Sequence, residues 1–262
     1  MTDTAVRAID AQHYWLSARF ERRDGWDPDR YPFNLPVLRG LHDLVFHPKV
    51  TFLIGENGSG KSTLIEALAV AWGFNAEGGG KNFNFGTRPS HSDLHRFVRP
   101  VRGVKRPKDG FFLRAESFFN VGTEIETLDR DPDSRGPPLI GAYGGVSLHE
   151  QSHGESFFAL LDHRFRGEGL YILDEPEAAL SPNRQLSFLA RLHELTRQAS
   201  QFIIATHSPI ILGYPHARIY QATAQGLEQV AYEDTDHYQV TRSFLNRRET
   251  FLEVLLSDGD DA

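Results

Sequence analysis

Apolar residues occur along the chain in short runs whose internal spacing differs from one run to the next. Three runs are mostly apolar and of strand length, as expected for strands buried on both faces of a parallel sheet. They lie at 49–54, 169–173 and 201–205. Three other stretches carry apolar residues at helical spacing, at 61–72, 152–165 and 181–200. Strands that alternate with helices predict a mostly parallel central sheet flanked by helices.

Further segments complete the predicted elements. Residues 13–20 and 41–46 are rich in aromatic and branched side chains and predict an antiparallel β layer ahead of the central sheet. The run 111–120 predicts another strand, and the stretch 129–145, rich in Asp, Pro and Gly, predicts a mobile loop.

The helix predicted over 181–200 has a clear start. Ser181 is the expected N-cap, and Pro182 takes the first helical position. Its apolar stripe is predicted to consist of Leu186, Leu189, Leu192 and Leu195.

Composition and charge narrow the class of protein. The chain has 262 residues, 40% of them hydrophobic and 24% charged, which is ordinary for a globular protein, and we expect a single domain over 1–262. A net charge of −7 argues against a protein that coats nucleic acid over its whole surface. The absence of cysteine excludes disulfides and thiolate metal sites. No apolar run reaches the length of a membrane helix and the first residues do not resemble a secretory signal, so we expect no membrane insertion and a cytoplasmic protein.

Between the first buried strand and the first helix lies "GENGSGKST", which fits the phosphate-binding pattern G-x-x-x-x-G-K-[ST]. Glycines let backbone N–H groups approach phosphate oxygens, the lysine reaches the terminal phosphates, and the serine hydroxyl suits Mg²⁺. We expect this loop to bind nucleotide through Gly55, Glu56, Asn57, Gly58, Ser59, Gly60, Lys61, Ser62 and Thr63.

Polar residues also follow the other two buried strands. Asp174 and Glu175 end the second, and His207 follows the third. Carboxylates here often cap a helix or form a salt bridge, and a histidine at a strand end is often structural. Beside a phosphate loop, Asp174 is the expected Mg²⁺ ligand together with Ser62, Glu175 is expected to polarise the attacking water, and His207 is expected to contact the γ-phosphate.

These motifs together resemble the ATP-binding-cassette (ABC) class of ATPases. "GENGSGKST" matches Walker A, "YILDEP" matches Walker B, "IIATHSP" matches the switch-histidine strand, and "QSHGES" stands where the class carries its signature sequence. The resemblance covers about residues 40–215 and implies an α/β P-loop NTPase fold of ABC-ATPase type. It further implies that ATP and Mg²⁺ are bound and that ATP is hydrolysed, with Glu175 and His207 as the catalytic residues.

The resemblance also implies a mode of assembly. In the class, two nucleotide-binding domains meet head to tail, with ATP between the phosphate loop of one and the signature helix of the other. Ser152, Gly154 and Glu155 would thus contact the nucleotide of a second copy, giving an ATP-dependent homodimer. The signature helix and its insert are expected within about 76–165.

Departures from the class pattern indicate a branch. "SHGES" and "LDEPEAALSP" look like the soluble, stand-alone ATPases often labelled AAA-type. Glu116 is the candidate for the Q-loop position, a metal and water contact, or equally an ion-pair partner of Arg114 or of a basic residue nearby. For stacking on adenine, four aromatic residues are available: Tyr14, Trp15, Tyr31 and Phe33.

The sequence leaves open which molecule the expected ATPase acts on. The segment 81–108 holds eight Lys or Arg against one Asp and includes Phe83, Phe85 and Phe97. It is interpreted either as a surface for nucleic acid or a partner protein, as in repair, maintenance and phage-defence relatives, or as a solvated loop that balances nearby acidic residues. The alternatives are the ATP-binding subunit of a membrane transporter and a non-hydrolysing nucleotide sensor, the second disfavoured by Glu175.

Overall fold

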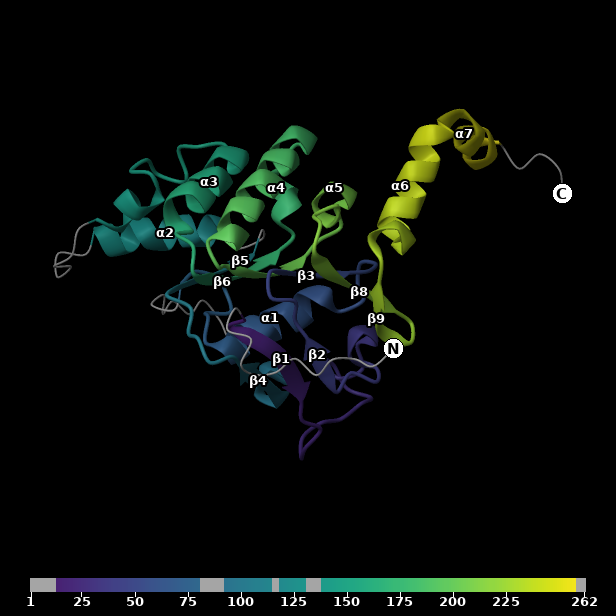
Figure 1. The fold of residues 1–262 in the computed structure, drawn as a ribbon, viewed down its shortest axis with the longest axis horizontal. Helices are drawn as coiled ribbons and strands as arrows, with labels where there is room; N and C mark the ends of the chain where they lie inside the picture. The colour runs from purple at the N-terminus through teal and green to yellow at the C-terminus, as the bar shows by residue number, and fades with distance from the viewer. Residues whose placement is uncertain (1–12, 81–91, 115–117, 131–137, 258–262) are drawn as a thin grey trace.

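The computed structural model describes residues 13–80, 92–114, 118–130 and 138–257. Two sheets form its framework, and helices lie on both faces of the larger one (Figure 1). The smaller sheet is antiparallel, with the order β2-β1-β4. Its strands are β1 (Trp15–Phe20), β2 (Asp43–Val45) and β4 (Val98–Arg102). The predicted antiparallel layer is therefore confirmed.

The larger sheet has the order β5-β6-β7-β3-β8-β9, and every neighbouring pair is parallel except β8 with β9. Its strands are β3 (Val50–Ile54), β5 (Asp109–Arg114), β6 (Gly169–Asp174), β7 (Gln201–Ala205), β8 (Ala217–Thr223) and β9 (Gly226–Val230). The mostly parallel α/β architecture is as predicted. Parallel strands bring their carboxyl ends to one edge of the sheet, where ligands of open α/β sheets bind.

The helices connect these strands and extend beyond them. They are α1 (Lys61–Trp72), α2 (Phe118–Asp129), α3 (His153–Ala159), α4 (Pro182–Arg197), α5 (Pro209–Leu212), α6 (Asp236–Asn246) and α7 (Arg248–Leu256). A π-helical turn, Leu160–Arg164, continues α3. In Figure 1, α1 lies beneath the large sheet with the small sheet, α3, α4 and α5 lie above it, and α6 and α7 extend away from the body.

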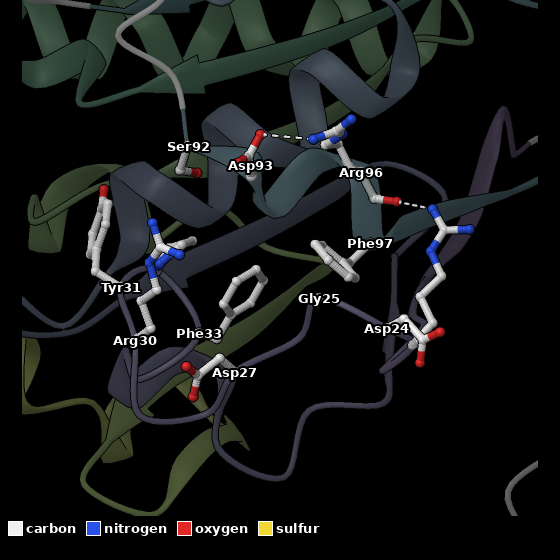
Figure 2. Close-up of a pocket in the computed structure, with 12 residues that line it drawn as sticks. Asp24, Gly25, Asp27, Arg30, Tyr31, Phe33, Ser92, Asp93, Arg96 and Phe97 are labelled. Carbon is white, nitrogen blue, oxygen red and sulfur yellow. Dashed lines mark hydrogen bonds and ion pairs between the residues drawn. The ribbon is translucent and has the colours of Figure 1, made fainter.

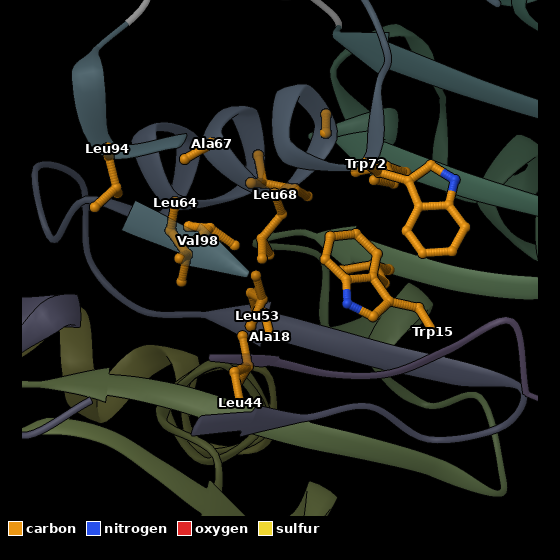
Figure 3. Close-up of a cluster of buried hydrophobic side chains, with 14 of the residues drawn as sticks. Trp15, Ala18, Leu44, Leu53, Leu64, Ala67, Leu68, Trp72, Leu94 and Val98 are labelled. Carbon is orange, nitrogen blue, oxygen red and sulfur yellow. The ribbon is translucent and has the colours of Figure 1, made fainter. Parts of the chain in front are cut away.

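The core has two parts because successive residues of a buried strand face opposite sides. In β6, Leu170 and Ile172 belong to the cluster beneath the sheet, whereas Tyr171 and Leu173 belong to the one above it. Figure 3 shows the lower cluster, in which side chains of the small sheet pack against α1. There the ring of Trp15 stacks on that of Trp72 with centroids 4.9 Å apart.

Three predictions about local structure were wrong. The strand predicted over 111–120 ends at Arg114, and Phe118 already begins α2, because a short apolar run is compatible with either element. Part of the loop predicted over 129–145 is a 3-10 helix, Leu139–Tyr143, whose first N–H groups are accepted by the Asp129 carboxylate. Tyr143 is buried in the upper core.

The third error concerns the apolar stripe of α4. Leu186 is 57% exposed, whereas Phe188 is fully buried. The buried face consists of Phe188, Leu192 and Leu195, which recur at the spacing of successive helical turns. The predicted start of this helix is correct, since the Ser181 hydroxyl accepts the N–H of Arg184 and Pro182 is the first helical residue.

Candidate nucleotide-binding site

The glycine-rich loop runs from the end of β3 to the start of α1. Gly55 has a φ of 144° and lies so close to β8 that an added Cβ would meet the methyl group of Ala222 at 2.8 Å. Gly60, the N-cap of α1, is left-handed with a φ of 99°. Only glycine accepts both the dihedral angles and the close packing, so the backbone is free to present its N–H groups.

Lys61 is buried, and its side chain turns back over the loop. Its Nζ donates to the carbonyl oxygens of Gly55 at 2.8 Å and of Glu56 at 2.9 Å. Burial lowers the pKa of the Lys61 ammonium, while the nearby carboxylates of Glu175 and Asp174 act in the opposite direction. The ammonium group is thus held against the carbonyl oxygens at the start of the loop, and in such motifs this lysine reaches the phosphates.

Asp174, the last residue of β6, is buried beside the start of α1. Its Oδ1 lies 3.4 Å from the hydroxyl Oγ of Ser62. A hydroxyl and a carboxylate are the hard oxygen donors that Mg²⁺ prefers, so this pair fits the metal expected from the sequence. The structure brings both residues together although 112 positions separate them.

Glu175 follows with a backbone conformation that is rare for its residue type. Its φ of 53° and ψ of 54° are left-handed, and its N–H donates to the carbonyl of Ala205 on β7. Strained dihedral angles at non-glycine residues cluster at functional sites, where the surrounding structure holds them. Here the strain turns the Glu175 carboxylate toward His207, whose Nε2 lies 3.5 Å from Oε1.

His207 is held at the end of β7 by several contacts. Its backbone N–H donates to the Glu177 carboxylate, and its ring Nδ1 lies 3.2 Å from Nε2 of His237. Burial, and then the charge of Lys61, lower the pKa of His207. The second histidine, His237 in the first turn of α6, escaped the sequence analysis because no motif marks it and it lies 30 residues away.

A second group missed by sequence analysis lies at the end of β5. Arg114 pairs with Asp174 in the β-sheet register, and its Nη1 lies 2.6 Å from Oε2 of Glu66 on α1. Its Nε is 3.9 Å from Oδ2 of Asp174. Arg114 stands two positions before Glu116 in the sequence, but its contacts with Glu66 and Asp174 depend on which strands are neighbours in the sheet. Glu116 itself lies outside the described residues, as do Phe83 and Phe85.

The signature residues lie on the opposite face of the large sheet from α1. The Ser152 side chain accepts the N–H of Glu155, and the Glu155 carboxylate accepts from the N–H and hydroxyl of Ser152, which makes a capping box at the start of α3. An added Cβ on Gly154 would lie 3.1 Å from the carbonyl oxygen of Ala179. The structure therefore does not bring Ser152, Gly154 and Glu155 to the phosphate loop of the same chain.

Of the four aromatic candidates for adenine stacking, only one is exposed. Tyr14, Trp15 and Phe33 are buried in the core, whereas Tyr31 is 59% exposed. The Tyr31 hydroxyl lies 3.4 Å from that of Thr63, in the glycine-rich loop motif. Tyr31 also borders a surface pocket whose apolar part is made by Phe33 and Phe97 (Figure 2).

The described part of the basic segment, 92–108, is largely engaged with its surroundings. Arg99 pairs with Glu21 at 3.4 Å, Lys108 with Glu168 at 2.6 Å, and the Arg102 guanidinium lies 4.6 Å from the ring centre of Trp72. Phe97 is buried and so is not available to stack on a base, contrary to the interpretation of this segment as a nucleic-acid surface.

Within the part of the chain that the structure describes, no helix is both long enough and apolar enough to cross a membrane. Two models of AAA domains match the chain. One is described as an AAA domain, putative AbiEii toxin, Type IV TA system, and matches residues 139–213; the other is described as an AAA domain and matches 34–108.

Related proteins are ATP-binding components. A putative ABC transporter ATP-binding protein of Methanothermobacter marburgensis is 27% identical over 88% of this chain and 87% of its own length. The energy-coupling factor transporter ATP-binding protein EcfA of Methanothermobacter thermautotrophicus is 28% identical over 72% of this chain, which spans only 64% of that relative.

Among solved structures, an inward-facing putative metal-chelate type ABC transporter superposes with a TM-score of 0.51 at 17% identity, over 87% of this chain and 88% of that chain. This likeness concerns the fold. The motif order and the ATP-binding relatives agree with each other: this chain is similar to ATPases of the ABC class.

Proposed function

We propose that this protein is a Mg²⁺-dependent ATPase that works as a switch, in which two copies join head to tail around ATP and separate after hydrolysis. The observation that carries the proposal is the meeting of four predicted residues at one edge of the sheet. Ser62 contacts Asp174, and Glu175 contacts His207, beside the glycine-rich loop. A phosphate-binding loop, a hard-oxygen pair and a carboxylate near a histidine are the parts that ATP hydrolysis requires.

Each side chain has a proposed task. Lys61 and the loop N–H groups bind the β- and γ-phosphates. Mg²⁺, held by Ser62 and Asp174, would neutralise charge on these phosphates. Glu175 orients the attacking water and accepts its proton, and His207 donates a hydrogen bond to a γ-phosphate oxygen.

The dimer is proposed because the signature residues of one chain lie far from the glycine-rich loop of the same chain. Ser152 and the capping box lie at the start of α3, across the large sheet from α1. In a head-to-tail pair, Ser152 and the N–H of Gly154 would meet the γ-phosphate of the other copy. Hydrolysis removes that shared contact, which gives a two-state switch biased by one phosphate.

For the base we propose Tyr31 as the stacking residue. It combines an exposed ring with a hydroxyl beside Thr63 at the start of α1. A solvent-exposed aromatic face suits a purine ring, which is apolar on its faces and polar at its edges.

The switch is proposed to act in the cytoplasm on a partner protein or nucleic acid. The local partners of Arg99 and Lys108 favour the view that much of the basic segment balances nearby acidic groups; Lys105 and Arg106 are among its exposed members. The second candidate, an ATP-binding subunit of a membrane transporter, is favoured by the names of the relatives. Purification of the tagged protein from its native cell would distinguish the two candidate functions, because a transporter subunit should co-purify with a membrane protein.

The test of the switch is the variant Glu175→Gln. Glutamine keeps the shape of glutamate but does not accept the water's proton, so ATP should bind and remain intact. We expect a dimer with ATP and a monomer with ADP in size-exclusion chromatography with light scattering. Adding Ser152→Arg should abolish the dimer but not ATP binding, whereas adding Lys61→Ala should abolish both. A monomer at saturating ATP would contradict the head-to-tail mechanism.

A further inference from the structure

Two histidine rings from separate elements meet beside the glycine-rich loop. Nδ1 of His207, just after β7, lies 3.2 Å from Nε2 of His237, in the first turn of α6. The other ring nitrogen of His207 points the opposite way, with Nε2 3.5 Å from Oε1 of Glu175. Glu175, His207 and His237 therefore form a chain in which each ring nitrogen of His207 faces a different group.

The chemistry of these groups selects one arrangement of protons. An ionised carboxylate only accepts hydrogen bonds, so it favours a proton on Nε2 of His207 and repels a lone pair there. A neutral imidazole carries one N–H, so Nδ1 of His207 must then be the acceptor. The proton between the rings accordingly belongs to His237, whose Nε2–H donates to His207.

Both rings are expected to be neutral, as this arrangement requires. Burial and the ammonium of Lys61 lower the pKa of His207, with Glu175 and Glu177 acting in the opposite direction. Burial, then His207 and Lys61, lower the pKa of His237, while Asp236 opposes them.

His237 is fixed in place by its surroundings. The neighbouring Asp236 accepts from the Gln221 side chain of β8 at 2.6 Å, and its own N–H donates to the same amide at 3.4 Å. The N-cap of α6, Thr235, is fully buried and donates to the carbonyl of Tyr232 at 2.7 Å. The bonds of Asp236 tie the start of α6 to β8 and the bond of Thr235 ties it to the preceding turn, so the ring of His237 is presented at a fixed position.

The pair also borders open space beside the loop. His207 and His237 line one pocket together with the loop residues 55–59. A group bound on the loop would therefore meet the Nε2 side of His207, while His237 supports the ring from behind. This distinguishes His237 from a histidine that only fills the core.

We propose that His237 is a positioning residue for the hydrolysis proposed above: its Nε2–H holds His207 in the Nε2–H tautomer and in the orientation that donates to the γ-phosphate. His237 does not itself touch the nucleotide. Without it, the His207 ring is free to rotate or to move its proton to Nδ1, and a lone pair then faces the phosphate. The inference rests on the proposed ATPase function, but the tautomer of His207 is measurable without any nucleotide.

The test compares His237→Gln with His237→Leu in the full chain. The glutamine amide places an N–H donor close to the position of the histidine Nε2, whereas leucine fills similar space without a donor. Long-range ¹H–¹⁵N spectra of ¹⁵N-histidine-labelled protein report the tautomer of each ring, and His207→Gln identifies the resonances of His207. The matched control is His193→Leu, since His193, on α4, contacts the Tyr214 hydroxyl outside the site.

We expect His207 to be the Nε2–H tautomer in the wild-type protein, in His193→Leu and in His237→Gln, and to become a mixture in His237→Leu. Loss of an orienting partner lowers turnover by about 10- to 100-fold, so we expect that decrease in His237→Leu, unchanged ATP affinity and near wild-type turnover in His237→Gln. Circular dichroism and the unfolding midpoint check that each variant is folded.

Three results would overturn the inference. They are an Nδ1–H tautomer of His207 in the wild type, an unchanged tautomer in His237→Leu, and equal turnover in the leucine and glutamine variants. If the wild-type protein binds ATP without hydrolysing it, the proposed ATPase function fails, and the tautomer spectra alone then decide whether His237 sets the state of His207.

Discussion

Arg114 and Glu66 form a largely buried ion pair that joins the end of β5 to α1, with 2.6 Å between Nη1 and Oε2. The arginine Nε also lies 3.9 Å from Oδ2 of Asp174. The pair therefore connects the helix that carries Lys61 and Ser62 to the strand next to the Asp174 strand. It helps to set the separation between the residues of the site.

Breaking this pair should destabilise the protein strongly. Glu66→Gln leaves the largely buried Arg114 charge without the carboxylate at 2.6 Å, so the free energy of unfolding should fall by about 3 kcal/mol. Chemical denaturation measures it. The matched control is Asp43→Asn, because the pair of Arg19 with Asp43 is exposed and 3.9 Å apart, and its loss should cost less than about 1 kcal/mol. Equal losses in the two variants would show that the Glu66 pair is no stronger than a surface contact.

A second consequence of Glu66→Gln concerns Asp174. Among the residues that the structure describes, Asp174 is the other carboxylate that the Arg114 guanidinium approaches, so with Glu66 neutral the guanidinium competes with a cation at Asp174. We expect more Mg²⁺ to be needed for half-maximal binding of a fluorescent ATP analogue. Unchanged Mg²⁺ dependence, in a folded variant, would mean that Arg114 does not reach Asp174 when Glu66 is neutral.

The proposed adenine contact predicts a loss specific to the base. Tyr31→Ala should weaken ATP binding about fivefold, the equivalent of one aromatic contact of about 1 kcal/mol. Tyr31→Phe should bind nearly as the wild type, because the ring provides the stacking face. Inorganic triphosphate, which has no base, is the control ligand in isothermal titration calorimetry. If Tyr31→Ala weakened triphosphate binding equally, the ring would act on the phosphate loop through Thr63 instead.

Much of the fold was predictable because its signals are local. The strands β3, β6 and β7 are mostly apolar runs, and the start of α4 is marked by Ser181 and Pro182. The exceptions, α2 and the turn at Leu139–Tyr143, have no such signal. The turn depends on the Asp129 carboxylate ten positions before it, which binds the N–H groups that a loop would leave to water.

The site divides in the same way. Residues from Gly55 to Thr63, with Asp174, Glu175 and His207, belong to contiguous motifs, so their roles could be predicted from the sequence. Arg114 and His237 have no motif around them, and their roles arise from which strands are neighbours and where α6 begins. Tyr31 differs from the three other aromatic candidates in its exposure to solvent. The sequence alone does not show this difference, because the turn-rich segment around Tyr31 has no regular pattern of apolar residues.

His47 should make stability depend on pH. Burial, then the charges of Arg218, His13, Lys49 and His216, lower its pKa to about 4 from 6.5. The unfolded chain therefore binds a proton between these values while the folded protein does not, so the free energy of unfolding falls as the pH falls from about 6.5 to 4.

The His47 contribution is isolated by a matched variant. Its Nδ1 accepts the N–H groups of Lys49 at 3.1 Å and Val50 at 3.4 Å, and the side-chain oxygen of His47→Asn keeps an acceptor there without titrating. The wild type should lose about 2 kcal/mol more than the variant across this range, after allowance for the partial exposure of the ring. Denaturant unfolding at several pH values measures it. Parallel curves would contradict the lowered pKa.

The capping box at the start of α3 predicts a further effect on assembly. Hydrogen bonds from Ser152 lower the pKa of the Glu155 carboxyl, so it carries a negative charge at neutral pH. In the proposed dimer this charge lies beside the γ-phosphate that Ser152 meets. Glu155→Gln removes the charge and keeps the cap, because glutamine completes a capping box as glutamate does. On the Glu175→Gln background, the ATP-bound dimer should therefore tighten by about threefold at low salt, and less at high salt.

Sedimentation equilibrium with ATP measures this change. Glu155→Ala is the control, since it removes the charge together with the cap and frays the start of α3, so it should not tighten the dimer. If Glu155→Gln weakened the dimer instead, the carboxylate would take part in binding the nucleotide, as expected for Glu155 from its place in the signature sequence. The direction of the change thus decides whether Glu155 opposes the incoming phosphate or helps to hold the second copy.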